Sequence, residues 1–218
     1  MGRRKRRTDA LRGELLAVAA GLLASGGSGA VTTRAVASGA GSSQAAVNEL
    51  FGGKAGLARA LFAEGFARLA AELRALESTG DPEADVLELA MAVRSFARRS
   101  PHLYEVMFSR PFAEFRPGPQ DARAAEEIYG LVLGRVTVLL GPDRAEGTAK
   151  DAAIGLFATV QGLVAHEASG LLGSGPESAD RRFRFVLTAA LRGLAAASTT
   201  APERPDASSR NRHRPETT

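Results

Sequence analysis

Apolar side chains recur along most of the chain at the three- and four-residue spacing of an amphipathic helix. The first such segment runs from Asp9 to about Ala24, where the glycine and serine residues of 25–29 end it because they tolerate left-handed backbone. A longer segment begins at Lys54 and carries an apolar stripe of Leu57, Leu61, Phe62, Phe66, Leu69, Leu73 and Leu76. The pattern therefore predicts an α-helix at each of these two places.

Two short helices are predicted between them. Each begins directly after a residue type that caps helix N-termini, Thr32 or Ser43. The first covers about residues 33–38 and stops at "GAG", where glycine permits a sharp reversal of the chain. The second reaches about Leu50, with Val47 on its inner side, and ends at a pair of glycines.

Longer amphipathic segments follow Pro82, separated by proline- and glycine-containing turns. They predict helices at residues 83–99, 101–114, 119–140, 143–172 and 177–197. Ala and Leu dominate the apolar residues and favour helix throughout, so we expect an all-α protein. Its expected parts are a basic disordered arm, a unit of short helices, a helical bundle and a disordered tail, covering residues 1–8, 9–54, 55–197 and 198–218.

Charge is distributed unevenly along the chain. Residues 1–54 hold eight Lys or Arg against three Asp or Glu, whereas residues 55–197 hold sixteen against eighteen. This asymmetry indicates a polyanionic partner for the first quarter of the chain. Five consecutive cations form the basic arm, which is either a DNA-contacting segment or a solubilising tail: Arg3, Arg4, Lys5, Arg6 and Arg7.

A basic arm followed by two capped short helices fits a helix-turn-helix, which places its second helix in the major groove of DNA. The side chains expected on the outer face of that second helix are small or polar, while Val47 and Leu50 are expected to face inward. Gln44 is able to read adenine through its amide, or is simply an exposed residue at a helix start. The outward residues are Ser43, Gln44, Ala45, Ala46 and Asn48.

Residues 15–57 resemble the N-terminal domain of the TetR family of transcriptional repressors. The similarity lies in "LLAVAAGLLASGG", "TTRAVASGAGSSQAAVNELF" and "GGKAGL", which are collinear with that domain. Further along, "FARRSPHLYEVMF" (96–108) and "FATVQGLVAHEASGLL" (157–172) are similar to parts of the ligand-binding and dimerising domain of one branch of the family. The resemblance implies a cytoplasmic homodimer that pairs through residues 143–197, binds a DNA operator and responds to a small-molecule effector.

The resemblance also assigns DNA contacts to individual residues. It implies phosphate contacts from Thr32 or Thr33, Arg34, Ser43 and Lys54, with Gln44, Ala45 and Ala46 nearest the bases. The chain departs from the family pattern at Ser28, Asn48, Glu49 and Leu50, where aromatic or histidine side chains are usual. Because a tyrosine in place of Asn48 commonly anchors a phosphate, we expect the basic arm to supply more of the affinity here.

A cluster of apolar residues in the second half has two interpretations. It packs helices together, or it lines a cavity for an apolar ligand that Tyr104, Gln161 and His166 orient. The candidate ligand-binding residues are Phe96, Leu103, Tyr104, Met107, Phe108, Phe112, Phe157, Gln161 and His166.

The sequence contains no motif that indicates a catalytic or metal site. The chain has no cysteine, and "HEASG" at His166 lacks the second histidine of a zinc-protease helix. Gly52-Gly53-Lys54 is not a Walker loop, which requires Gly at position 48 and Ser or Thr at 55. We also see no apolar run long enough to cross a bilayer and no signal peptide. We therefore expect no enzyme, cofactor or metal; the alternatives are a weakly specific DNA-binding architectural protein and a helical-bundle enzyme.

Overall fold

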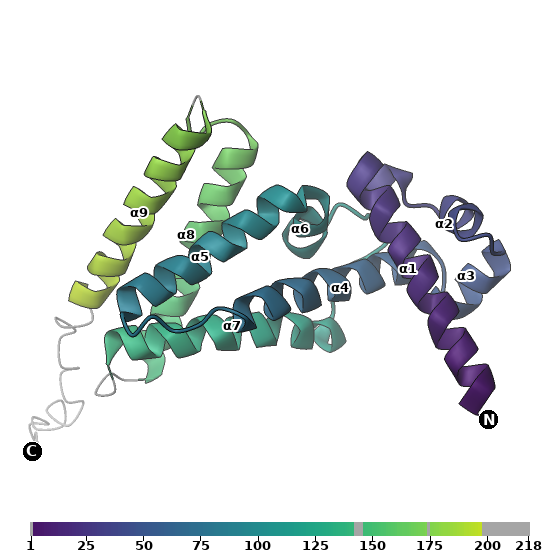
Figure 1. Cartoon of the computed structure of the whole chain (residues 1–218), viewed down its shortest axis with the longest axis horizontal. Helices are drawn as coiled ribbons and strands as arrows, with labels where there is room; N and C mark the ends of the chain where they lie inside the picture. The colour runs from purple at the N-terminus through teal and green to yellow at the C-terminus, as the bar shows by residue number, and fades with distance from the viewer. Residues whose placement is uncertain (1, 142–145, 174, 198–218) are drawn as a thin grey trace, which may run out of the picture.

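The computed structural model describes residues 2–141, 146–173 and 175–197. These residues form helices and no strands, as predicted (Figure 1). The expected tail at 198–218 lies outside the described residues. The helices are α1 (Gly2–Ala30), α2 (Thr33–Gly39), α3 (Gln44–Phe51), α4 (Lys54–Arg74), α5 (Pro82–Arg99), α6 (Pro101–Phe108), α7 (Pro119–Leu140), α8 (Glu146–Ala168) and α9 (Pro176–Ala197).

Helices α1 to α3 pack on the start of α4 at one end of the molecule (Figure 1). The predicted caps form: the backbone N–H of Ala35 donates to Thr32 Oγ1 and that of Ala46 donates to Ser43 Oγ, both at 3.1 Å. The shared core of these helices is fully apolar and consists of Leu15, Ala19, Leu23, Val36, Val47, Leu57 and Leu61. Local capping and a common apolar core together account for two helices that are too short to be stable alone.

Helix α1 differs from the sequence prediction at its N-terminal end. Residues 2–8, expected as a disordered arm, are its first turns, because Arg and Lys are good helix formers and no proline or glycine follows Gly2 before Gly13. At the other end Gly27 has a left-handed φ of 65° and interrupts the helical geometry. Residues Thr8–Ala30 have the length and hydropathy of a membrane span, contrary to expectation. Leu15, Ala19 and Leu23 of this segment are buried in the core.

Helix α6 is shorter than predicted and ends at Phe108 rather than near residue 114. Arg110 precedes a proline, which disfavours helical backbone, and it adopts a positive φ of 53°. The segment that follows is nevertheless anchored, because Phe112 and Phe115 are buried.

Helices α8 and α9 contact each other and lie at the end opposite α1–α3 (Figure 1). Helix α8 ends at Ala168, before the predicted residue 172, and Gly170 adopts a left-handed φ of 72° just beyond it. The predicted residues 143–145 lie outside the described part of the chain.

A buried arginine ties this pair of helices to the rest of the bundle. Arg94 of α5 is 2% exposed, and its guanidinium donates to both carboxylate oxygens of Glu167 at 2.7 and 2.8 Å. A third hydrogen bond of 2.7 Å reaches Asp180 of α9, and the ring of Phe183 lies 4.7 Å below the guanidinium carbon. Hydrogen bonds from Arg94 hold the pKa of Glu167 and that of Asp180 below their usual values, so both stay charged at neutral pH.

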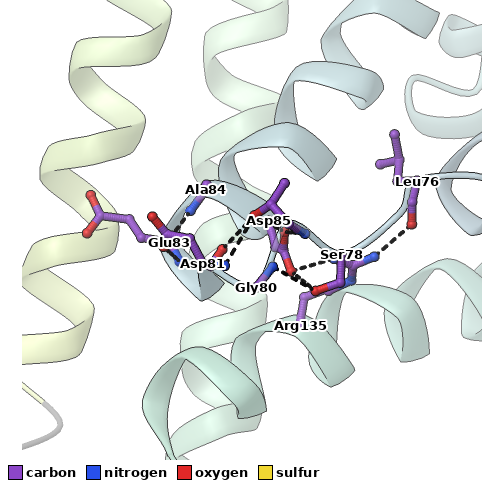
Figure 2. A network of polar contacts seen from close by, with 9 residues as sticks. Leu76, Ser78, Gly80, Asp81, Glu83, Ala84, Asp85 and Arg135 are labelled. Carbon is purple, nitrogen blue, oxygen red and sulfur yellow. Dashed lines mark hydrogen bonds and ion pairs between the residues drawn. The ribbon is translucent and has the colours of Figure 1, made fainter.

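A second polar network joins the α4–α5 connection to α7 (Figure 2). Asp85 accepts hydrogen bonds from Ser78 Oγ at 2.5 Å and from the backbone N–H and hydroxyl of Thr79 at 2.7 Å each. Arg135 lies 2.9 Å from the same carboxylate and also donates to the carbonyl of Leu76. These contacts, led by the Ser78 hydroxyl, lower the pKa of Asp85 to about 2. The turn is therefore pinned to α7 by a carboxylate that remains ionised.

Replacing Arg94 with Ala is expected to lower the free energy of unfolding by about 2–4 kcal/mol, because Glu167 would keep a partly buried charge without its partner. Chemical denaturation measures this loss. Arg98 on the same helix is the matched control: its side chain is 55% exposed and 3.9 Å from Glu167, so Arg98→Ala should cost no more than about 0.5 kcal/mol. Equal losses in the two variants would contradict the role given to Arg94.

Candidate nucleic-acid interface and ligand pocket

The outer face of α3 is exposed and carries small and polar side chains. Gln44, Ala45 and Asn48 are exposed, Ala46 is half-buried and Val47 is fully buried. Helix α2 approaches α1 closely at Gly39, where a Cβ atom would lie 2.7 Å from Val18 Cγ1. The backbone N–H of Ser42 then donates to the carbonyl of Ala37 at 2.9 Å and closes the turn that leads into α3. The fold thus presents the N-terminal part of α3 to a partner.

The first turns of α2 and α3 meet at the predicted contact residues. Gln44 Nε2 donates to Thr33 Oγ1 at 2.8 Å, which fixes the side-chain amide beside the start of α2. Thr32 and Arg34 are exposed on the same turn of α2. A planar amide held in one orientation is suited to bidentate hydrogen bonding with a base edge.

The first turns of α1 carry basic residues, and one of them contacts α3. Among the cations of the basic arm, Arg6 is exposed. The side chains of Arg3, Arg4, Lys5 and Arg7 lie outside the described part of the structure. Arg12 was not among the predicted residues; its guanidinium carbon lies 4.8 Å from the ring centre of Phe51 at the end of α3. The one sequence signal for Arg12 was its position five residues after Arg7, close enough to belong to the same basic segment.

Lys54 occupies the first position of α4, as predicted, but it has a partner. Its Nζ lies 3.0 Å from Glu114 Oε1 and 5.9 Å from the ring centre of Phe112. The ammonium remains 35% exposed. Glu114 was not predicted, because it lies 60 residues from Lys54 and no local pattern connects the two.

A pocket of about 320 Å³ lies between α5, α6 and α8. Three of the predicted ligand-binding residues line it, Tyr104, Phe108 and Gln161. The rest of its lining comes from residues that sequence analysis did not single out, and consists of Ala97, Pro101, His102, Glu105, Ser109, Val164, Ala165 and Ala168.

The other predicted pocket residues lie elsewhere. Phe96, Met107 and Phe112 are buried in the core, and Leu103 lines a separate space of about 110 Å³ beside α1. Phe157 is half-buried and packs against Phe108, with ring centres 5.8 Å apart. In the described structure these residues pack between helices and do not line the pocket of about 320 Å³.

His166 is a further departure from the predicted pocket. It is exposed, and its Nδ1 lies 2.9 Å from the carbonyl of Gly162 on its own helix. It therefore does not orient a ligand in this pocket.

Two polar side chains of the pocket, Tyr104 and Gln161, form a hydrogen-bonded pair. Tyr104 donates its hydroxyl to Gln161 Oε1 at 2.6 Å, and burial raises the pKa of Tyr104, so the phenol stays protonated. Gln161 Nε2 is buried and is the one such side-chain atom without a hydrogen-bond partner among the described residues. A buried donor without a partner is unfavourable, and an acceptor on a bound molecule would satisfy it. Within the described chain, no group of three or more His, Cys, Asp or Glu is arranged to hold a metal ion.

Two family models match the chain. Residues 15–61 match the model for bacterial regulatory proteins of the tetR family, and residues 86–190 match that for the tetracyclin repressor-like C-terminal domain. No curated protein sequence matches the chain. The two matched regions correspond to α1–α4 and to the bundle that contains the pocket.

Solved structures share the whole fold. A protein with unknown function from Rhodococcus sp. RHA1 is 31% identical, with 85% of this chain and 95% of that chain covered and a TM-score of 0.70. A transcriptional regulator from Rhodococcus sp. Rha1 is 21% identical, with coverage of 88% and 99% and a TM-score of 0.65. A TetR variant from Acinetobacter baumannii AYE in complex with minocycline is 20% identical, with coverage of 85% and 97% and a TM-score of 0.61.

The last two structures are too distant in sequence to indicate more than the fold. The tetR-family model and the helix-turn-helix geometry agree on the same residues, those of 15–61. The C-terminal domain model matches the bundle that follows. The chain belongs to the TetR family of transcriptional regulators.

Proposed function

We propose that this chain is a repressor that binds a pseudo-palindromic operator as a homodimer and leaves it when a small molecule fills the pocket. It works in the cytoplasm and has no catalytic activity. The observation that carries the proposal is the exposed, capped start of α3, where Thr33 fixes the amide of Gln44 at 2.8 Å.

In the proposed complex α3 lies in the major groove. Gln44, Ala45 and Ala46 face base edges, and the small alanines allow close approach. Phosphates are held by Thr32, Thr33, Arg34, Ser43 and Lys54 and by the basic first turns of α1. Asn48, at the outer side of α3, contacts the edge of the groove. Two such helices in a dimer meet successive major grooves about 34–36 Å apart.

Selection of bound duplexes from random DNA is expected to return an inverted repeat, because twofold symmetry of the protein imposes it on the site. Gln44→Ala should relax the preference at one base pair in each half-site and weaken binding there by about 1–3 kcal/mol. Sequencing of the selected pool and anisotropy titrations measure both effects. A pool without a palindromic consensus would contradict the proposal and favour the architectural DNA-binding protein.

The outer faces of α8 and α9 supply the proposed dimer interface. Within the predicted pairing region 143–197, the large apolar residues Phe183, Leu187 and Leu191 of α9 are buried in the protomer itself. Ile154 and Phe185 point outward and are 57% and 72% exposed. The outer faces of α8 and α9 also carry small exposed residues, which let two helices approach closely, beside exposed charged ones such as Asp151 and Arg181. The small residues are Gly155, Ala158, Gly162, Ala189, Gly193 and Ala196.

Phe185→Asp is expected to convert the dimer to monomer at micromolar concentration, because it places a charge at the centre of an apolar contact. Sedimentation velocity measures the change. Val138→Asp on α7 is the control, since Val138 is an equally bare apolar residue, 65% exposed, outside the α8–α9 face. A wild-type monomer, or two variants that behave alike, would contradict this interface.

The proposed effector has an apolar body and a hydrogen-bond acceptor. Phe108, Val164 and Ala165 provide apolar walls, and the unpartnered amide of Gln161 provides the donor. Tyr104 orients that amide by donating to its oxygen, which leaves the nitrogen for the ligand. Binding shifts the population toward a dimer whose recognition helices no longer match successive grooves.

A matched pair of probes tests this assignment. Benzophenone should bind about three- to tenfold more tightly than 1,1-diphenylethylene, which has the same shape but lacks the carbonyl acceptor. Isothermal titration calorimetry measures both affinities. Gln161→Leu should remove the difference, whereas Gln120→Leu at the exposed start of α7 should keep it. If the wild type showed no preference for the ketone, Gln161 would not be the donor.

A further inference from the structure

The start of α4 concentrates positive charge. Lys54 is its first residue, no acidic residue lies in its first turn, and no side chain caps it. The N-terminus of a helix also carries the positive end of the helix dipole. This end of α4 therefore attracts an anion, and in the free protein the carboxylate of Glu114 supplies one at 3.0 Å from Lys54 Nζ.

Glu114 is held in place by the residues on either side of it. Phe112 and Phe115 are 3% and 5% exposed. The Phe115 ring packs edge-on against Phe62 of α4, with ring centres 5.5 Å apart, and the guanidinium carbon of Arg59 lies 5.6 Å from it. The carboxylate is thus presented by an anchored segment and does not depend on a mobile loop to reach Lys54.

The carboxylate is also ionised at neutral pH. The backbone N–H of Glu114 and then the ammonium of Lys54 hydrogen-bond to it and hold the pKa of Glu114 below its usual value. Both partners remain accessible, with Lys54 35% and Glu114 46% exposed. A phosphate group is consequently able to reach Lys54, but it has to displace a charged oxygen that occupies the same position.

We propose that Glu114 competes with DNA phosphate for Lys54 and thereby sets the operator affinity of the free protein. This inference rests on the proposed function. An exposed ion pair of this kind is weak, so the competition reduces affinity by a small factor and does not abolish binding. A stronger pair would block the phosphate contact altogether.

The test is a double-mutant cycle on the duplex selected from random DNA, with binding followed by fluorescence anisotropy over a range of salt concentrations. Glu114→Gln should bind about two- to fivefold more tightly than wild type. Lys54→Ala should bind more weakly and flatten the dependence of log K on log salt by about one unit. In the Lys54→Ala background, Glu114→Gln should bring no gain, because the cation that it releases is absent.

Glu126→Gln is the control for the change in net charge, since Glu126 is exposed on α7. It should leave affinity near that of wild type. An equal gain from Glu126→Gln and Glu114→Gln, or a gain from Glu114→Gln that persists without Lys54, would overturn the inference. Failure of the wild type to select any duplex would instead contradict the proposed function. Circular dichroism melts establish that the Glu114→Gln protein is folded as wild type is.

Discussion

The buried guanidinium of Arg94 decides where the last two helices lie on the rest of the bundle. It comes from α5 and binds one carboxylate on α8 and another on α9, so a single side chain fixes three helices. Removing these charges from water is costly, and the bidentate geometry with Glu167, the hydrogen bond to Asp180 and the ring of Phe183 compensate it. Apolar contacts between alanine and leucine are non-directional, whereas these hydrogen bonds require one geometry. The position of α8 then places Gln161 against Tyr104, and the position of α9 leaves Phe185 on the outside.

The pocket and the DNA-facing surface are joined by a short stretch of chain. Phe108 and Ser109 line the pocket at the end of α6, and Glu114 meets Lys54 only a few residues later. The aromatic rings of this stretch form a continuous series of contacts, from Tyr104 to Phe108 and from Phe108 to Phe66 of α4. Packed rings transmit a displacement because interiors are dense and resist compression. A ligand that moves the end of α6 would therefore act on α4 both through packing and through the carboxylate at its first residue.

Local patterns predicted the fold well, and contacts between distant residues account for what they missed. Capping residues and glycine turns located α2 and α3 because those signals act within one turn of helix. The helix at residues 177–197 was predicted, but an amphipathic pattern does not tell which neighbour covers its apolar side, and the protomer itself covers Phe183 and Leu187. His166 was assigned to the pocket together with Gln161, yet five residues along a helix rotate a side chain by about 140°. Val164, Ala165 and Ala168 share the face of Gln161, and they are the residues that line the pocket.

The residues at which α3 departs from the family pattern affect the charge of the DNA-binding domain, as the Lys54–Glu114 ion pair does. Asn48 and Glu49 are both exposed, so α3 carries an amide and a negative charge on its outer side. Glu114 adds a second carboxylate at Lys54, the first residue of α4. Two cations of α1 have the opposite sign: Arg6 is exposed near its N-terminus, and Arg12 lies against the ring of Phe51 at the end of α3. Attraction from a charged helix acts over about a Debye length and changes steeply with salt, whereas the carboxylates oppose contact only at close range. In the proposed complex the attraction from α1 therefore varies with ionic strength, whereas the ion pair at the start of α4 adjusts affinity by a small factor.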